Sequence, residues 1–137
     1  MRKITEIIVH CSDTPEGRDD RAADIDRWHK QRGFDGIGYH YVIDIDGTIE
    51  AGRDIERAGA HAQGHNANSI GICYIGGADK NMKPKDTRTD AQKDSLLCLL
   101  RFLRLMYKDA KIIGHRDVSS KPCPCFDAKT EYKELCE

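Results

Sequence analysis

The sequence has 137 residues, so we expect a single domain spanning residues 1–137, because one domain typically has ~150 residues. Apolar residues make up 39% and charged residues 33%, a balance typical of a globular chain rather than a disordered one. The 22 Lys and Arg residues are offset by 23 Asp and Glu residues, which gives a net charge of -1. This balance excludes the excess positive charge with which proteins bind nucleic acid or anionic lipid, and we expect neither partner.

The N-terminal segment MRKITEIIVH carries an apolar run that Thr5 and Glu6 interrupt. It matches neither a signal peptide nor a membrane span, so we expect synthesis in the cytoplasm and no membrane partner. The chain has 6 cysteines among its 137 residues, a share below the roughly 8–10% that marks a disulfide scaffold. We therefore expect mainly reduced thiols.

The first two predicted elements are a strand and a helix. Residues 4–10 form a β-branched run of strand length, and the polar stretch after them ends it. Residues 21–32 carry apolar side chains at three-residue spacing, with Asp19 or Asp20 as the expected N-cap and Gly33 just past the C-terminus. This pattern predicts a short amphipathic helix.

A hairpin, a long loop and a buried strand are expected next. Residues 39–45 and 48–51 are β-rich, and Asp46-Gly47 between them favours a tight turn joining antiparallel strands. Segment 53–68 is rich in Gly, Ala and His without a sustained period, and a loop of this length in a compact domain is more often a functional site than an accident. Residues 69–75 have the composition of a buried strand.

The main helix is expected in the C-terminal half. Thr89 and Gln92 form a capping box, and residues 96–106 carry an apolar stripe at helical spacing. The other elements expected in this half are a surface loop at 76–88, a strand at 111–114 and a terminal helix at 126–135 with Asp127 as its cap.

This order of elements predicts an α/β fold in which a central mixed β-sheet is flanked by helices. Crossovers that contain helices favour parallel neighbours, and the hairpin supplies the antiparallel pair. Three cysteines in apolar segments are expected to be small core residues: Cys11, Cys73 and Cys98.

Two histidines lie where predicted strands end. His10 closes the first strand and His115 follows the last one. In open α/β sheets ligands gather outside the carboxyl ends of the strands, and neighbouring strands lie ~4.8 Å apart, so two imidazoles on neighbouring strands could share one zinc ion. Cys123 and Cys125, in KPCPCF, offer thiolates. A His, His, Cys set with water in the fourth position would be a catalytic zinc site.

Four blocks of the sequence, taken in order, carry a family resemblance: VHCSDTP, GYHYVIDIDGTIEAGR, GAHAQGHNANSIGICYIGG and GHRDVSSKPCPCFD. Together they resemble the zinc-dependent N-acetylmuramoyl-L-alanine amidases, a family that includes amidase-type phage lysozymes and peptidoglycan recognition proteins. The resemblance covers nearly the whole chain. It implies that family's fold, one zinc ion, and hydrolysis of the amide between the lactyl group of N-acetylmuramic acid and L-alanine of peptidoglycan, with the bacterial cell wall as the place of action. We expect a monomer.

The resemblance also implies roles for individual residues. His10, His115 and Cys123 match the zinc ligands. Tyr39 and Lys121 match active-site residues that could stabilise charge on the carbonyl oxygen, and Lys121 could instead protonate the leaving amine. In the long loop, candidate substrate-binding residues are His61, His65 and Asn66.

Alternatives remain open at this stage. The chain could be a recognition module that binds peptidoglycan without cutting it, although such modules typically lack the metal cysteine. His115, Cys123 and Cys125 could form a structural zinc site, but that would leave His10 and Tyr39 unexplained. If the segment holding Cys123 and Cys125 is extended, their thiols point to opposite sides, and only one faces the histidines.

Overall fold

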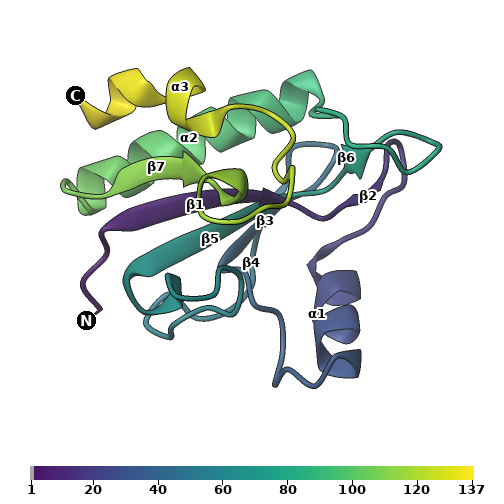
Figure 1. The fold of residues 1–137 in the computed structure, drawn as a ribbon, viewed down its shortest axis with the longest axis horizontal. Helices are drawn as coiled ribbons and strands as arrows, with labels where there is room; N and C mark the ends of the chain where they lie inside the picture. Colours follow the sequence, from purple (N-terminus) through teal and green to yellow (C-terminus); the bar gives the residue numbers. More distant parts are fainter. Residues whose placement is uncertain (1) are drawn as a thin grey trace.

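The computed structural model describes residues 2–137, and a five-stranded sheet lies at its centre (Figure 1). In chain order the elements are β1 (Glu6–Cys11), β2 (Thr14–Pro15), α1 (Ala22–Gln31), β3 (Tyr41–Ile43), β4 (Ile49–Ala51), η1 (Asn66–Asn68), β5 (Ser69–Tyr74), β6 (Gly77–Ala78), α2 (Asp90–Met106), β7 (Lys111–Gly114), η2 (His115–Asp117), α3 (Ala128–Glu131) and η3 (Lys133–Cys136).

The sheet is mixed, as the sequence predicted. Its strand order is β4-β3-β5-β1-β7; β3 and β4 are antiparallel, and the other neighbours are parallel. The hairpin turn is closed by Asp46, whose side chain accepts a hydrogen bond from the Thr48 N–H at 3.0 Å, and by Gly47 with a φ of 89°. Because β1 lies between β5 and β7, the strand that contains His10 is a neighbour of the strand that ends just before His115.

The two faces of the sheet have different partners. Along β1, Ile7 and Val9 pack with α2 and the C-terminal segment, while Ile8 packs with Ala62 and Ile113 on the opposite face. Helix α1 covers the end of that second face through Ile25. Because side chains alternate along a strand, His10 points to the face of Ile8 and α1.

Short strands β2 and β6 correct the expectation of plain loops after β1 and after β5. They pair in parallel, with Thr14 opposite Gly77 and Pro15 opposite Ala78. Each strand has two residues, so no periodicity in the sequence could reveal it. The pair holds the two loops together at one side of the molecule (Figure 1).

The expected N-cap of α1 is also wrong. The helix starts at Ala22, and the Arg21 N–H donates to the Asp24 carboxylate at 2.8 Å. Asp19 instead pairs with the Arg21 guanidinium at 3.0 Å, and Asp20 pairs with Arg18 at 2.7 Å. Both carboxylates that were expected to cap the helix therefore form ion pairs with neighbouring arginines instead.

Helix α2 begins as predicted and buries one face. Thr89 accepts from the Gln92 N–H at 3.1 Å, and the Gln92 side chain accepts from the Thr89 N–H at 2.9 Å. Cys98, expected in the core, is exposed, whereas Leu96, Leu99 and Leu100 are buried. The run LLCLL is apolar on every side, so its sequence could not assign the face. The expected terminal helix is split into α3, capped by Asp127, and η3.

Within residues 2–137, every helix is too short or too polar to cross a membrane.

Candidate functional site

His10 and His115 meet because their strands are parallel neighbours. Val9 lies opposite Gly114 in the β1–β7 register. His10 directly follows Val9 and His115 directly follows Gly114, so the two histidines are brought side by side. Their ring centroids are 4.4 Å apart. His10 is buried and His115 is partly exposed. The adjacency that the sequence could only assume is therefore present.

Cys123 completes a three-residue group. The loop that carries it returns to the sheet, where the Arg116 N–H donates to the Cys123 carbonyl at 2.7 Å and the Cys11 N–H donates to the Cys123 sulfur at 3.1 Å. Donor atoms of His10, His115 and Cys123 all lie within 4.8 Å of one another. Two imidazoles and a thiol at this spacing fit the ligand chemistry of one zinc ion and leave a fourth position open.

Cys125 points elsewhere. Its thiol donates to the Gly77 carbonyl at 3.2 Å, and among residues 2–137 the group capable of holding a metal does not include it. The segment is a turn rather than the extended strand we considered, because the Cys125 N–H donates to the Pro122 carbonyl at 2.7 Å and Cys125 has a φ of 71°. The thiols still diverge, which argues against a structural site built from Cys123 and Cys125 together.

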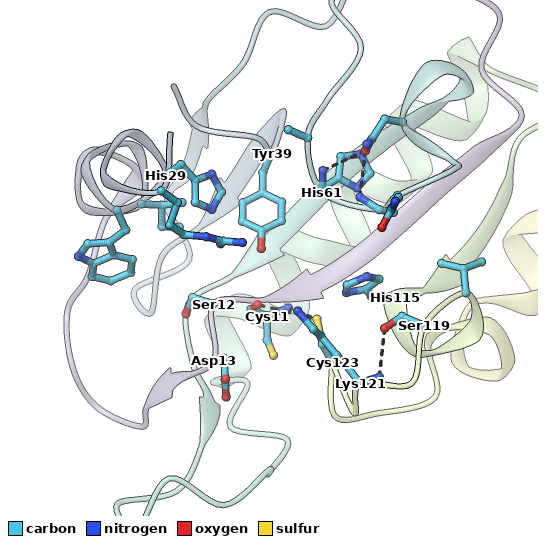
Figure 2. Close-up of a pocket in the computed structure, with 18 of the residues that line it drawn as sticks. Cys11, Ser12, Asp13, His29, Tyr39, His61, His115, Ser119, Lys121 and Cys123 are labelled. Atoms are coloured by element: carbon cyan, nitrogen blue, oxygen red, sulfur yellow. Dashed lines mark hydrogen bonds between the residues drawn. The ribbon is translucent and has the colours of Figure 1, made fainter. Parts of the chain in front are cut away.

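Tyr39 lies in the loop before β3 and not in the strand where we expected it. Its ring centroid is 5.0 Å from that of His10, and Figure 2 shows its hydroxyl directed into the space that His115 and Cys123 also face. Burial raises the pKa of this hydroxyl well above its ordinary value, so it stays protonated at neutral pH and can donate a hydrogen bond.

His29 is a site residue to which sequence reasoning gave no role. Its Nδ1 accepts from the Gly38 N–H at 2.9 Å, and its ring centroid is 5.5 Å from that of Tyr39. Because Nδ1 accepts a hydrogen bond from a main-chain N–H, the neutral ring carries its own proton on Nε2. His29 thus holds the loop that positions Tyr39. The sequence signal for this position was that His29 comes four residues after the buried Ile25, which places both on the same face of the helix.

An open cavity of about 1080 Å³ lies over these residues. Tyr39, His115 and Cys123 line it, together with Lys121, whose side chain is exposed. Helix α1 forms part of another wall, through Trp28. Two members of the candidate metal group, His115 and Cys123, and the two expected catalytic residues therefore open onto one space large enough for an extended substrate.

The three loop residues expected to bind substrate have different positions. His61 and Asn66 line the cavity. The Asn66 side-chain oxygen accepts from the N–H groups of His61 and Ala62, each at 2.9 Å, so it fixes the loop backbone. His65 is outside the cavity lining, and its Nδ1 lies 2.7 Å from the Glu6 carboxylate.

Burial keeps the site histidines neutral. It lowers the pKa of His10 well below the usual value, with His61 and His115 as smaller causes. It also lowers the pKa of His115, with the Lys121 ammonium as the smaller cause. The pKa of His61 falls to about 3, mainly through burial and then through His40. Neutral imidazoles are the form that binds metal.

A family model described as N-acetylmuramoyl-L-alanine amidase matches residues 1–126. The chain belongs to this family. The endolysin of Escherichia phage T7 is 45% identical over 130 residues, covering 94% of this chain and 86% of that relative. The solved amidase LysC from Clostridium intestinale URNW is 32% identical, covers 98% of this chain and 86% of that one, and superposes with a TM-score of 0.82.

These relatives confirm the expected fold and activity: the chain is an amidase of the phage-endolysin type. A Drosophila PGRP-LB variant solved in complex with tracheal cytotoxin shares the fold, with 26% identity, a TM-score of 0.79, and coverage of 97% of this chain and 82% of that one. A module that only binds is the weaker alternative, because the matching family model and the solved LysC structure are both described as N-acetylmuramoyl-L-alanine amidases.

Proposed function

We propose that this amidase is zinc-dependent and cuts the amide between the lactyl group of N-acetylmuramic acid and L-alanine in peptidoglycan. The observation that carries the proposal is the convergence of His10, His115 and Cys123 donor atoms within 4.8 Å of one another beside the cavity. Two nitrogens and one sulfur are a donor set suited to zinc, and three protein ligands are typical of catalytic rather than structural sites.

A zinc ion bound there would polarise a carbonyl and lower the pKa of a water molecule toward neutrality. Tyr39 and Lys121 supply the remaining functions. The protonated Tyr39 hydroxyl donates a hydrogen bond toward the oxygen on which negative charge develops. Lys121 brings an ammonium group to the cavity wall, where it can stabilise the same charge or give a proton to the leaving amine.

The substrate is proposed to be peptidoglycan or a soluble muropeptide, with the cell wall as the place of action. Endolysin relatives and the relative solved with tracheal cytotoxin support this substrate class. The cavity fits it chemically, because Trp28 and Phe34 offer flat apolar surface for sugar or peptide while Arg32 and Gln63 offer polar groups. The loop that carries His61, His65 and Asn66 borders the proposed substrate site. His61 and Asn66 line the cavity, and His65 does not.

Product analysis tests the bond and the metal together. Purified peptidoglycan is treated with the zinc-loaded protein, with protein stripped by a chelator, and with stripped protein given zinc again. We expect free stem peptides that begin at L-alanine, and intact glycan, in the first and third reactions only. Equal hydrolysis by the stripped protein would refute zinc dependence, and cleaved glycan or a cut within the peptide would refute the proposed bond.

A further inference from the structure

One of the two ring nitrogens of His10 already has a protein partner. Its Nε2 lies 2.8 Å from Nδ1 of His61, and the two rings are perpendicular, with centroids 4.8 Å apart. A ring nitrogen that makes a hydrogen bond is not free to bind a metal at the same time. Only Nδ1 of His10 is therefore left for the metal.

We propose that His61 is a positioning residue, which fixes the tautomer and the orientation of His10 so that Nδ1 is presented to the metal. This role rests on the proposed zinc dependence and deepens it. A metal on Nδ1 requires the ring proton of His10 on Nε2, and that proton is then donated to Nδ1 of His61. A metal ligand held in this way by a second group is better oriented and more basic.

The proton arrangement continues one step further. If Nδ1 of His61 accepts, its own ring proton is on Nε2, and this nitrogen lies 3.3 Å from the hydroxyl of the buried Ser69. Ser69 can accept that hydrogen bond. With both of its nitrogens engaged inside the protein, His61 has no ring nitrogen left for substrate, even though its ring lines the cavity.

The protein has a built place for the His61 ring. Gly71, on β5, lies beneath it, and a Cβ added there would come within 2.6–2.8 Å of the ring. Asn66 holds the backbone at His61 through two hydrogen bonds to its side-chain oxygen. The absence of a side chain at Gly71 and the fixed backbone at His61 together place the ring against His10. A residue that merely filled space would not need this exact placement.

The test compares two substitutions at this position. His61→Phe keeps a ring but removes both nitrogens, whereas His61→Asn can place its side-chain oxygen where Nδ1 was. Zinc affinity is measured by competition with a chromogenic chelator. We expect His61→Phe to bind zinc about 10- to 100-fold more weakly, the range typical when the partner of a ligand is removed, and His61→Asn to restore most of the affinity.

A second readout needs no metal. Proton–nitrogen correlation spectra of the histidine rings show which nitrogen carries the proton, and in the metal-free protein we expect His10 to carry it on Nε2. In His61→Phe we expect a mixture of tautomers. Because this measurement does not involve zinc, it tests the His10–His61 pair even if the proposed zinc dependence fails.

His65→Gln is the matched control, since it lies on the same loop and pairs with Glu6 instead of His10. We expect zinc affinity and the His10 tautomer to be unchanged in it. The proposal is overturned if His61→Phe binds zinc as tightly as the wild type with the same His10 tautomer. It is equally overturned if His65→Gln weakens zinc binding as much as His61→Phe, because the loss would then come from the loop and not from the hydrogen bond.

Discussion

Tyr39 and Lys121 differ from the three candidate ligands in their chemistry, because His and Cys side chains are the ordinary ligands of zinc, whereas a tyrosine hydroxyl and a lysine ammonium group are hydrogen-bond donors. Both line the cavity, so each can act on the reacting atoms without holding the metal. We expect Tyr39→Phe and Lys121→Ala to lower kcat by about 10²- to 10³-fold, the usual loss when one donor to a developing oxyanion is removed. Zinc content, measured on the same samples, should stay at the wild-type level; loss of metal or full activity in either variant would contradict the assigned role.

The two thiols of the C-terminal loop provide a comparison between residues only two positions apart. The sulfur of Cys123 faces the histidines, whereas the thiol of Cys125 donates a hydrogen bond to the Gly77 carbonyl. We expect Cys123→Ser to lose tight zinc binding and activity, and Cys125→Ser to keep the metal. Metal analysis after dialysis distinguishes them, and the reverse pattern would move the ligand to Cys125.

The sequence indicates ligands better than it indicates their partners. His10 and His115 could be found because one closes a predicted strand and the other follows one, and strand ends are visible as a change from apolar to polar residues. The position of His61 could not be found in this way, since its contact with His10 depends on the space left by Gly71 in another strand. Contacts between a loop and a distant strand leave no periodic trace in the sequence.

At the scale of elements, the N-terminus of α1 is fastened to the hairpin through charged groups. Glu50 accepts from the Ala22 N–H at 2.8 Å, and the buried Asp44 accepts from Arg21 at 2.9 Å. Burial, and then the neighbouring Glu50, raise the pKa of Asp44 to about 7. Arg21, which also contacts Asp46, opposes this increase only in part.

This arrangement predicts a pH dependence of stability. Because the pKa of Asp44 is higher in the folded protein than its ordinary value of 3.8, the folded state binds the proton more tightly. The contribution is present below pH ~4 and is lost as the pH rises toward ~7. In the wild type this lowers the free energy of unfolding by on the order of 1–4 kcal/mol across this pH interval, and Asp44→Asn should remove that decrease. Urea unfolding at a series of pH values measures it, with Asp46→Asn as the exposed control; an unchanged slope in Asp44→Asn would refute the prediction.

The capping box of α2 is an element that the sequence specified locally. Thr89 also donates its hydroxyl to the Ile45 carbonyl at 2.8 Å, and the Gln92 side chain donates to the carbonyls of Ile43 and Ile75. The box thus joins the helix start to the ends of β3 and β5. We expect Thr89→Ala to lower the free energy of unfolding by about 0.5–2 kcal/mol. Thermal or urea unfolding tests this against the exposed Lys93→Ala, which should change stability far less.

Elements that depend on distant pairing were not predictable. The strands of the central sheet have enough apolar residues to be recognised one by one, and the hairpin has its Asp-Gly turn. Strands β2 and β6 exist only because residues 14–15 and 77–78 meet, and neither pair of residues has a strand-like pattern alone. The break between α3 and η3 likewise lies within a segment whose sequence reads as one short helix.

At the scale of the whole molecule, the candidate metal group joins the two ends of the chain. His10 comes from β1, His115 from the start of η2, and Cys123 from the loop before α3. In the unfolded chain these residues are far apart, so a metal that needs all three binds the folded state preferentially. Such a ligand raises the free energy of unfolding according to its concentration relative to its dissociation constant.

Zinc should therefore act as a stabilising ligand in addition to its proposed catalytic role. At a free zinc concentration 100 times the dissociation constant, we expect an increase of about 2.7 kcal/mol in the free energy of unfolding. Melting curves recorded with zinc, with chelator, and with chelator followed by zinc would show this as a reversible shift in Tm. Cys123→Ser is the control, because a variant that lacks one of the three donors should show little shift. An equal zinc-dependent shift in that variant would mean that the ion binds elsewhere, and no shift in the wild type would mean that the three donors do not act as a metal site.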